Sequence, residues 1–128
     1  MAGYVTNIEE QTEENANFRK VLFTAPHSQL VLMSLKPNEE IGMEVHNLDQ
    51  FIRIEAGEGK AILDGEEFDL RGGSAVVIPE GTNHNIINTS SDKELKLYTV
   101  YSPANHPDGT IHKTKEEAME YEKEEHGG

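Results

Sequence analysis

From residue 18 onward, the chain alternates between short runs of β-branched and aliphatic residues and clusters of turn residues rich in Gly, Pro, Asn and Asp. The runs predicted as strands are 18–24, 29–35, 50–55, 60–63, 67–70, 75–78, 85–88 and 95–101. Asp64-Gly65 between two of these runs predicts a two-residue hairpin, because both central positions of a type I′ turn need a positive φ. Short strands at regular spacing predict an all-β sandwich or a small barrel.

A length of 128 residues gives room for one domain with a hydrophobic core of ordinary size. We therefore expect a single domain over 1–128, with a barrel core at about 18–103, an N-terminal segment 1–17 and a tail 104–128. The opening dozen residues are expected to be disordered. Helix is expected only in the tail, where Thr114 to Glu117 fits a capping box that precedes a run of helix formers.

The composition excludes several classes of partner and site. The formal net charge is −13, from 11 basic and 24 acidic side chains, so the field of the protein repels nucleic acid. Cysteine is absent, which excludes disulfides and thiolate zinc sites. The N-terminal sequence lacks the basic and apolar regions of a secretory signal, and no apolar run is long enough to cross a bilayer. We therefore expect a cytoplasmic protein with no nucleic-acid or membrane partner.

Polar residues with ligand chemistry occupy positions that should face the core. Glu44, His46 and Gln50 stand at even spacing, on the side of an extended chain that also carries two isoleucines of the following strand. At a rise of about 3.3 Å per residue, Glu44 and His46 are roughly 6.6 Å apart and can converge on one ion. Gln50 would lie about 13 Å beyond His46 on a straight strand, so the chain must bend at the turn formers 47–49 to bring them together.

A second patch of the same kind lies at 73–88. There a strand of buried type ends at a Pro79-Glu80-Gly81 turn, and His84 opens the next strand on the face that carries Ile86. Two imidazoles, one carboxylate and one amide that converge from two hairpins would make a four-ligand site. Such a donor set suits a divalent first-row metal better than Ca²⁺ or Mg²⁺. The predicted metal ligands are Glu44, His46, Gln50 and His84.

These residues carry a resemblance to the cupin superfamily. The second cupin motif is matched at each marked position, namely Gly73, Pro79, Gly81, His84 and Asn88. The first motif is matched in outline by Glu44, His46, Gln50 and Gly57 at the family spacing. Over about 18–103 the chain thus resembles small single-domain cupins. The resemblance implies a cupin double-stranded β-helix, or jelly-roll barrel, with one divalent metal ion in its interior and with assembly as a homodimer.

The first motif also departs from the family pattern. The usual motif has a His-x-His pair followed by Glu, whereas this chain has Glu44-x-His46 followed by Gln50. Asn38 stands where the motif opens with Gly. The number of anionic ligands is still one, so a bound divalent ion would keep a net positive charge. The resemblance does not decide whether the bound metal is Zn, Fe, Mn or Ni.

Each candidate residue also has a purely structural interpretation. Glu44 would be an exposed rim carboxylate if the strand register slipped by one residue. Gln50 would be a hydrogen-bonding partner that orients His46 rather than a ligand. His106 and His112 lie among turn residues of the tail, where histidines are usually solvated. A tail folded over the barrel mouth would instead make these two histidines acid–base groups or part of a lid.

Three classes of function fit these residues. The leading hypothesis is a metal-dependent enzyme acting on a small polar or anionic metabolite, with isomerase or lyase chemistry on a sugar or uronate and the cation as Lewis acid. The second is an Fe(II)-dependent dioxygenase, in which His46, His84 and Glu44 form a two-His-one-carboxylate site. The third is a non-catalytic module that binds a metal or a small ligand. The substrate and the reaction stay open at this point.

Overall fold

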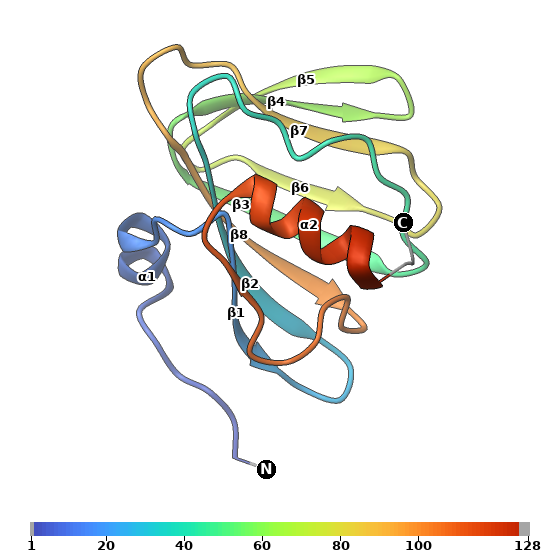
Figure 1. Ribbon diagram of the computed structural model, residues 1–128. Coiled ribbons are helices and arrows are strands. Elements are labelled where there is room, and N and C mark those ends of the chain that lie inside the picture. The colour runs from blue at the N-terminus through green and yellow to red at the C-terminus, as the bar shows by residue number, and fades with distance from the viewer. Residues whose placement is uncertain (1, 126–128) are drawn as a thin grey trace.

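Antiparallel β-strands make up most of the regular secondary structure (Figure 1). The computed structural model describes residues 2–125. Its strands are β1 (Arg19–Thr24), β2 (Gln29–Leu35), β3 (Asp49–Ala56), β4 (Glu58–Leu63), β5 (Glu66–Arg71), β6 (Ala75–Ile78), β7 (His84–Asn88), β8 (Leu95–Ser102) and β9 (Ile111–His112). Helix α1 (Ile8–Glu14) precedes these strands, and helix α2 (Lys115–Glu125) follows them. The predicted all-β fold with a short C-terminal helix is confirmed.

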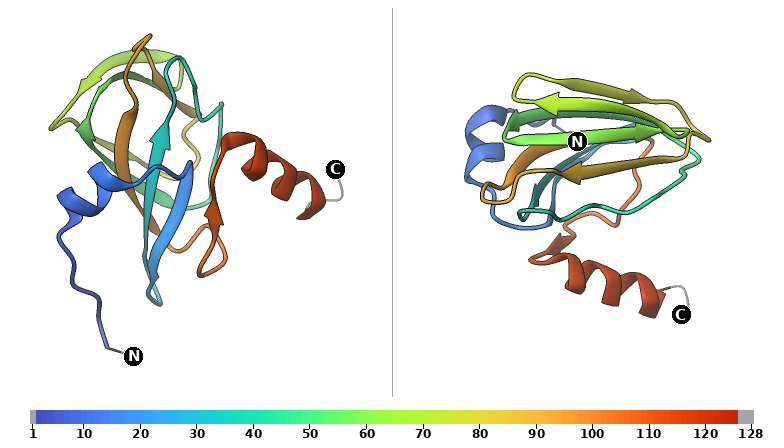
Figure 2. Two further views of the ribbon diagram at one scale, coloured as in Figure 1. Left: turned by 60° about the vertical axis from the view of Figure 1, so that its left-hand side comes forward. Right: turned by 90° about the horizontal axis from the view of Figure 1, so that it is seen from above.

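The strands form two sheets that pack face to face as a jelly-roll barrel (Figures 1 and 2). The larger sheet has six strands in the order β6-β3-β8-β2-β1-β9, and the smaller sheet has three in the order β5-β4-β7. The segment 39–46 runs beside β7 and extends the smaller sheet through isolated bridges from Glu40 to Ile87 and from Glu44 to His84. The first predicted ligand segment therefore lies directly beside the second.

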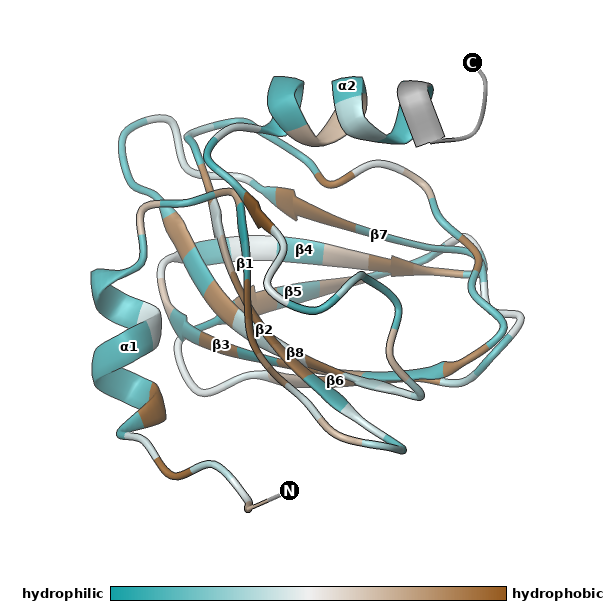
Figure 3. Ribbon diagram, turned by 60° about the horizontal axis from the view of Figure 1, so that its bottom comes forward, coloured by the Kyte–Doolittle hydropathy of each residue, from teal (hydrophilic) through white to brown (hydrophobic). Residues whose placement is uncertain are grey.

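The hydrophobic core fills the space between the two sheets. Its members include Val31, Met33, Leu35, Ile52, Ile54, Leu95 and Leu97 from the larger sheet and Ala61, Leu70 and Ile86 from the smaller one. In β3, Gln50, Ile52 and Ile54 are buried, while Phe51 and Arg53 between them are partly exposed. In Figure 3 the hydrophobic stretches lie mainly on the strands, whereas α1 and α2 are mostly hydrophilic. This alternation of buried and exposed positions in β3 was predicted from the sequence. It places one polar side chain of β3, that of Gln50, inside the barrel.

Turn residues connect the strands as predicted. Asp64 and Gly65 both have positive φ, 47° and 85°, in the hairpin between β4 and β5. Gly57 joins β3 to β4 with a φ of 100°, and a Cβ atom there would lie only 2.6 Å from the carbonyl oxygen of Glu94. The predicted strand bounds differ from those of the structure by at most two residues.

The N-terminal segment contains α1, so the expectation that helix occurs only in the tail is wrong, as is the expected disorder for the part of the first dozen residues that α1 covers. The side-chain oxygen of Asn7 caps α1 by accepting a hydrogen bond from the backbone N–H of Glu10 at 3.0 Å. Thr12 of the helix is buried, and the Lys96 ammonium donates to the carbonyl oxygen of Asn15 at 2.5 Å. A helix this short depends on such contacts with distant strands rather than on its own periodicity.

The tail returns to the barrel after β8. Strand β9, which the sequence did not predict, pairs with β1 so that His112 lies opposite Arg19. Thr114 caps α2 as predicted, because its hydroxyl accepts a hydrogen bond from the backbone N–H of Glu117 at 3.1 Å. Ala118 of α2 packs into the core. Residues 126–128 of the predicted tail lie outside the described residues. Neither α1 nor the described α2 is long and apolar enough to span a membrane.

Candidate metal site

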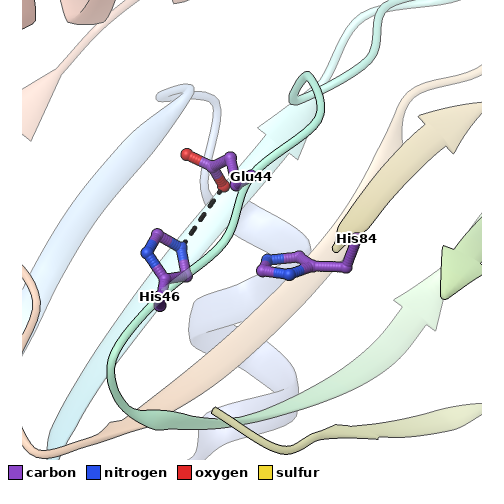
Figure 4. Close-up of side chains that lie close together, drawn as sticks. All are labelled: Glu44, His46 and His84. Carbon is purple, nitrogen blue, oxygen red and sulfur yellow. Dashed lines mark ion pairs between the residues drawn. The ribbon is translucent and has the colours of Figure 1, made fainter. Parts of the chain in front are cut away.

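Glu44, His46 and His84 come together at the start of β7 (Figure 4). Glu44 and His84 are joined by two backbone hydrogen bonds, from Glu44 N to His84 O at 2.8 Å and from His84 N to Glu44 O at 2.9 Å. Directly paired residues of antiparallel segments point their side chains to the same face. One potential ligand atom from each of the three side chains lies within 4.8 Å of the other two. This spacing suits the binding of a single metal ion.

His84 is oriented so that one ring nitrogen is left free for a ligand. Its Nδ1 lies 3.0 Å from the carbonyl oxygen of Thr82, which can only accept a hydrogen bond, so Nδ1 is the donor. In the neutral ring Nε2 then carries a lone pair. The residue is only 3% exposed, and its Nε2 has no hydrogen-bond partner among the described residues. A metal ligand needs this arrangement of the ring.

His46 also has a buried nitrogen without a hydrogen-bond partner among the described residues. Its backbone is fixed by a hydrogen bond from Gly81 N to His46 O at 2.9 Å, which ties the first motif segment to the turn before β7. Its Nε2 lies 3.6 Å from Oε1 of Glu44, longer than a hydrogen bond, and is buried. The His46 and His84 rings lie 5.2 Å apart between centroids. His46 and Glu44 thus lie at ion-pair distance (dashed line in Figure 4), and the His84 ring lies beside them without a hydrogen bond to either side chain.

Gln50 lies on the other sheet, after the bend that the sequence predicted. The chain bends at Asn47 and Leu48 and enters β3 in the larger sheet. The side-chain amide of Gln50 donates to Thr99 Oγ1 at 3.0 Å, while its Oε1 is buried without a partner. Its neighbour in the sheet is Tyr101, whose ring lies 6.0 Å from that of His46. Ligation by Gln50 stays a prediction.

A cavity of about 360 Å³ adjoins this cluster. It is lined by Arg19, Glu44, His46, Asn105, His106, Pro107, Tyr121 and Glu122. These residues come from β1, from the first motif segment and from the tail. The tail therefore forms one wall of a pocket whose other wall carries two of the candidate ligands.

His106 is held at this cavity by Gln29, a buried residue of β2. The side-chain oxygen of Gln29 accepts hydrogen bonds from the backbone N–H groups of Asn105 at 3.1 Å and His106 at 3.0 Å, and its amide donates to the His106 carbonyl at 2.7 Å. Burial, and then the positive charge of Arg19, lower the pKa of His106 to about 3. Its ring is therefore neutral at physiological pH.

His112, the other predicted acid–base candidate, is not among the residues that line this cavity. It lies in β9, where its Nδ1 accepts a hydrogen bond from Arg19 Nη1 at 3.3 Å and its ring stands 5.2 Å from that of Tyr121. Burial lowers the pKa of His112, with a further contribution from Arg19. The structure gives this residue a packing role between β1 and α2.

Arg19 is the residue of this region that the sequence interpretation missed. It shares the inward face of β1 with Val21, and both are buried. A charged residue at an inward strand position is the same kind of signal that pointed to His84. Applied to β1, it would have pointed to Arg19 as well.

Comparison with known proteins agrees with this architecture. A family model described as "Cupin domain" matches residues 31–101. The chain belongs to the cupin family. This cupin is 53% identical over 113 residues to the uncharacterized protein L612 of Acanthamoeba polyphaga mimivirus, which covers 84% of this chain and 70% of that protein. It is 46% identical over 123 residues to the uncharacterized protein YrkC of Bacillus subtilis, which covers 91% of this chain and 66% of that protein.

The cupin chain thus spans about two thirds of the length of both these relatives. Among solved structures, BH2720 from Bacillus halodurans matches this cupin with a TM-score of 0.90 and 41% sequence identity, over 93% of this chain and 95% of that one. The similarity extends well beyond the region that matches the family model, so it includes much of the N-terminal segment and the tail.

Proposed function

We propose that this cupin is a cytoplasmic metal-dependent enzyme that acts on a small polar metabolite. It would bind one divalent ion through Glu44, His46 and His84, with Gln50 as the fourth ligand. The leading chemistry is that of an isomerase or a lyase, in which a proton moves beside a carbonyl or hydroxyl group.

A set of buried polar atoms without hydrogen-bond partners carries this proposal. His46 Nε2, His84 Nε2 and Gln50 Oε1 are all buried, and none of them has a hydrogen-bond partner in the part of the chain that the structure describes. Buried polar atoms are paired in nearly all proteins. Here the unpaired atoms are ring nitrogens and an amide oxygen, and a carboxylate accompanies the two rings. A divalent first-row cation satisfies such a donor set.

A bound ion of this kind supplies Lewis acidity to a carbonyl or hydroxyl oxygen of the substrate. The residues of the cavity would bind and orient the rest of the molecule. With a pKa of about 3, His106 is a weak base, so it suits a hydrogen bond to a substrate hydroxyl better than proton abstraction. Asn105 beside it offers an amide with both donor and acceptor capacity.

A specific observation also favours a second function, that of an Fe(II)-dependent dioxygenase. The three side chains that cluster within 4.8 Å are two imidazoles and one carboxylate, the ligand set of many non-heme Fe(II) oxygenases. Oxygen uptake by iron-loaded protein in the presence of candidate substrates separates this function from isomerase or lyase action, which consumes no oxygen.

The proposal is tested by metal analysis and calorimetric Zn²⁺ titration of the wild type and of His46→Ala, His84→Ala and Gln50→Ala. We expect one equivalent of metal in the wild type and a loss of binding in both histidine variants. Gln50→Ala should bind roughly 10–100-fold more weakly, whether Gln50 is a ligand or orients one. His27→Ala is the matched control, since His27 is exposed in a turn and should bind as the wild type does. Equal metal content in His84→Ala and the wild type would contradict the proposal.

A further inference from the structure

The cavity beside the metal site contains a buried cation without a counter-ion. Arg19 is only 3% exposed and lines the cavity together with Glu44 and His46. None of the described carboxylates forms an ion pair with its guanidinium. Its Nε is buried without a hydrogen-bond partner. In a chain with 24 acidic residues, a buried guanidinium without an acidic partner is unexpected.

The neighbours of Arg19 hold its side chain in place but leave its charge uncompensated. Its Nη1 donates to Nδ1 of His112 at 3.3 Å, and an imidazole that accepts a hydrogen bond is neutral at that nitrogen. The guanidinium carbon lies 5.3 Å from the centre of the Phe18 ring, which adds a cation–π contact. A buried charge that lacks an ionic partner destabilises a fold, so its presence at a cavity points to a ligand.

The chemistry of the guanidinium selects the ligand. Its N–H donors lie in one plane at a spacing that matches the two oxygens of a carboxylate. The guanidinium has no acceptor atom, so it can only donate hydrogen bonds. Glu122 of α2 also lines the cavity, but its side chain is exposed and makes no ion pair with Arg19. The remaining polar groups on the tail side, Asn105 and His106, are neutral and suit hydroxyl or carbonyl groups.

We propose that the substrate is a small organic acid, and that Arg19 binds its carboxylate while a hydroxyl or carbonyl oxygen of the same molecule reaches the Glu44/His46/His84 site. This inference rests on the proposed function and narrows its substrate class. Arg19 is then the residue that selects acids over neutral molecules of the same shape.

The test uses cobalt-loaded protein and two matched pairs of probes, lactate with lactamide and galacturonate with galactose. Binding is followed by the visible absorption of Co²⁺ and by calorimetry. We expect at least one acid to bind, with its neutral counterpart at least tenfold weaker. Arg19→Met should reduce the affinity for that acid at least tenfold, whereas Arg71→Gln, which removes an exposed arginine at the end of β5, should not.

Thermal melting distinguishes ligand binding from a structural role of Arg19. Replacing an unpaired buried charge by an apolar side chain of similar length should leave the melting temperature of Arg19→Met unchanged or higher.

Glu122→Gln should bind the acid at least as tightly as the wild type does. A wild type that binds neither acid, or that binds acid and neutral probe equally, overturns the inference, as does undiminished acid binding by Arg19→Met.

The same experiment separates this inference from the proposed function. Absence of Co²⁺ binding by the wild type would defeat the proposed function, whatever the probes do. Calorimetry of the metal-free protein with the same probe pairs would then still report whether Arg19 prefers the acid. Normal Co²⁺ binding without discrimination between acid and neutral probe would defeat only the inference about the substrate.

Discussion

Two histidines near the candidate metal site form hydrogen bonds to their neighbours through different ring nitrogens, Nδ1 in His84 and Nε2 in His106. The nitrogen that each ring leaves free decides what it can bind. His84 donates from Nδ1 to the Thr82 carbonyl, which leaves the lone pair of Nε2 free for a metal. In His106, Nε2 lies 3.4 Å from the amide nitrogen of Asn105, which can only donate. Nδ1 of the neutral His106 ring then carries the hydrogen. His84 is thus prepared as a metal ligand and His106 as a hydrogen-bond donor.

We predict that His106→Gln makes the fold less sensitive to acid. The pKa of His106 is lowered to about 3 in the folded protein, against an ordinary value of 6.5. Between these two pKa values the unfolded chain binds more protons, so the free energy of unfolding falls as the pH drops through this window. From pH 7 to pH 5 the metal-free wild type should lose roughly 1–2 kcal/mol more than His106→Gln. Urea unfolding at both pH values measures this, and equal losses in the two proteins would contradict it.

At the scale of elements, the sequence predicted those strands and turns whose own residues carry the pattern. β3 alternates buried and exposed residues, and Asp64-Gly65 is a hairpin signal by itself. β9 has two residues and exists because it pairs with β1, far away in the sequence. α1 is polar and depends on contacts with β8 and β3. Its only local signal is the spacing of Asn7 and Glu10, which fits the start of a helix.

We predict that Gly57→Ala destabilises the protein more than Gly73→Ala. The two glycines have nearly the same φ, 100° and 96°, so the backbone strain that a side chain adds is similar, about 1–2 kcal/mol. A Cβ atom at residue 57 would also lie 2.6 Å from Glu94 O, whereas at residue 73 nothing lies within 4 Å. Overpacking against the backbone should add a further 1–3 kcal/mol, as a rough range, for Gly57→Ala. Urea unfolding of both variants measures the difference, and equal destabilisation would argue against this close packing.

At the scale of the whole molecule, the sequence identified the two motifs but not the cavity that adjoins them. Glu44, His46 and His84 were predicted because each motif is a local pattern, and the structure brings them together. The position of His106 depends on Gln29, and that of Arg19 on the pairing of β1 with the tail. Such long-range contacts leave no periodic signal in the chain. The homodimer and the absence of nucleic-acid partners stay predictions.

We predict that removal of the metal lowers the melting temperature of the whole fold. An ion that binds only the folded state at 100 times its Kd stabilises that state by about 2.7 kcal/mol, a shift on the order of 10 °C for a domain of this size. Differential scanning calorimetry before and after chelation measures the shift. His84→Ala should have the same melting temperature with and without the chelator. Unchanged melting of the wild type after verified metal removal would contradict the prediction.

The pocket wall that carries Arg19 and His106 lies outside residues 31–101, the region shared with the family model. Substitutions in this wall can therefore accumulate without changing the segments that carry the candidate metal ligands. Two cupins with identical motifs would then retain one metal chemistry and process different molecules. Assigning substrates across such proteins requires alignment of residue 19 and of the loop before β9, since the barrel alone groups them by ligand set rather than by substrate.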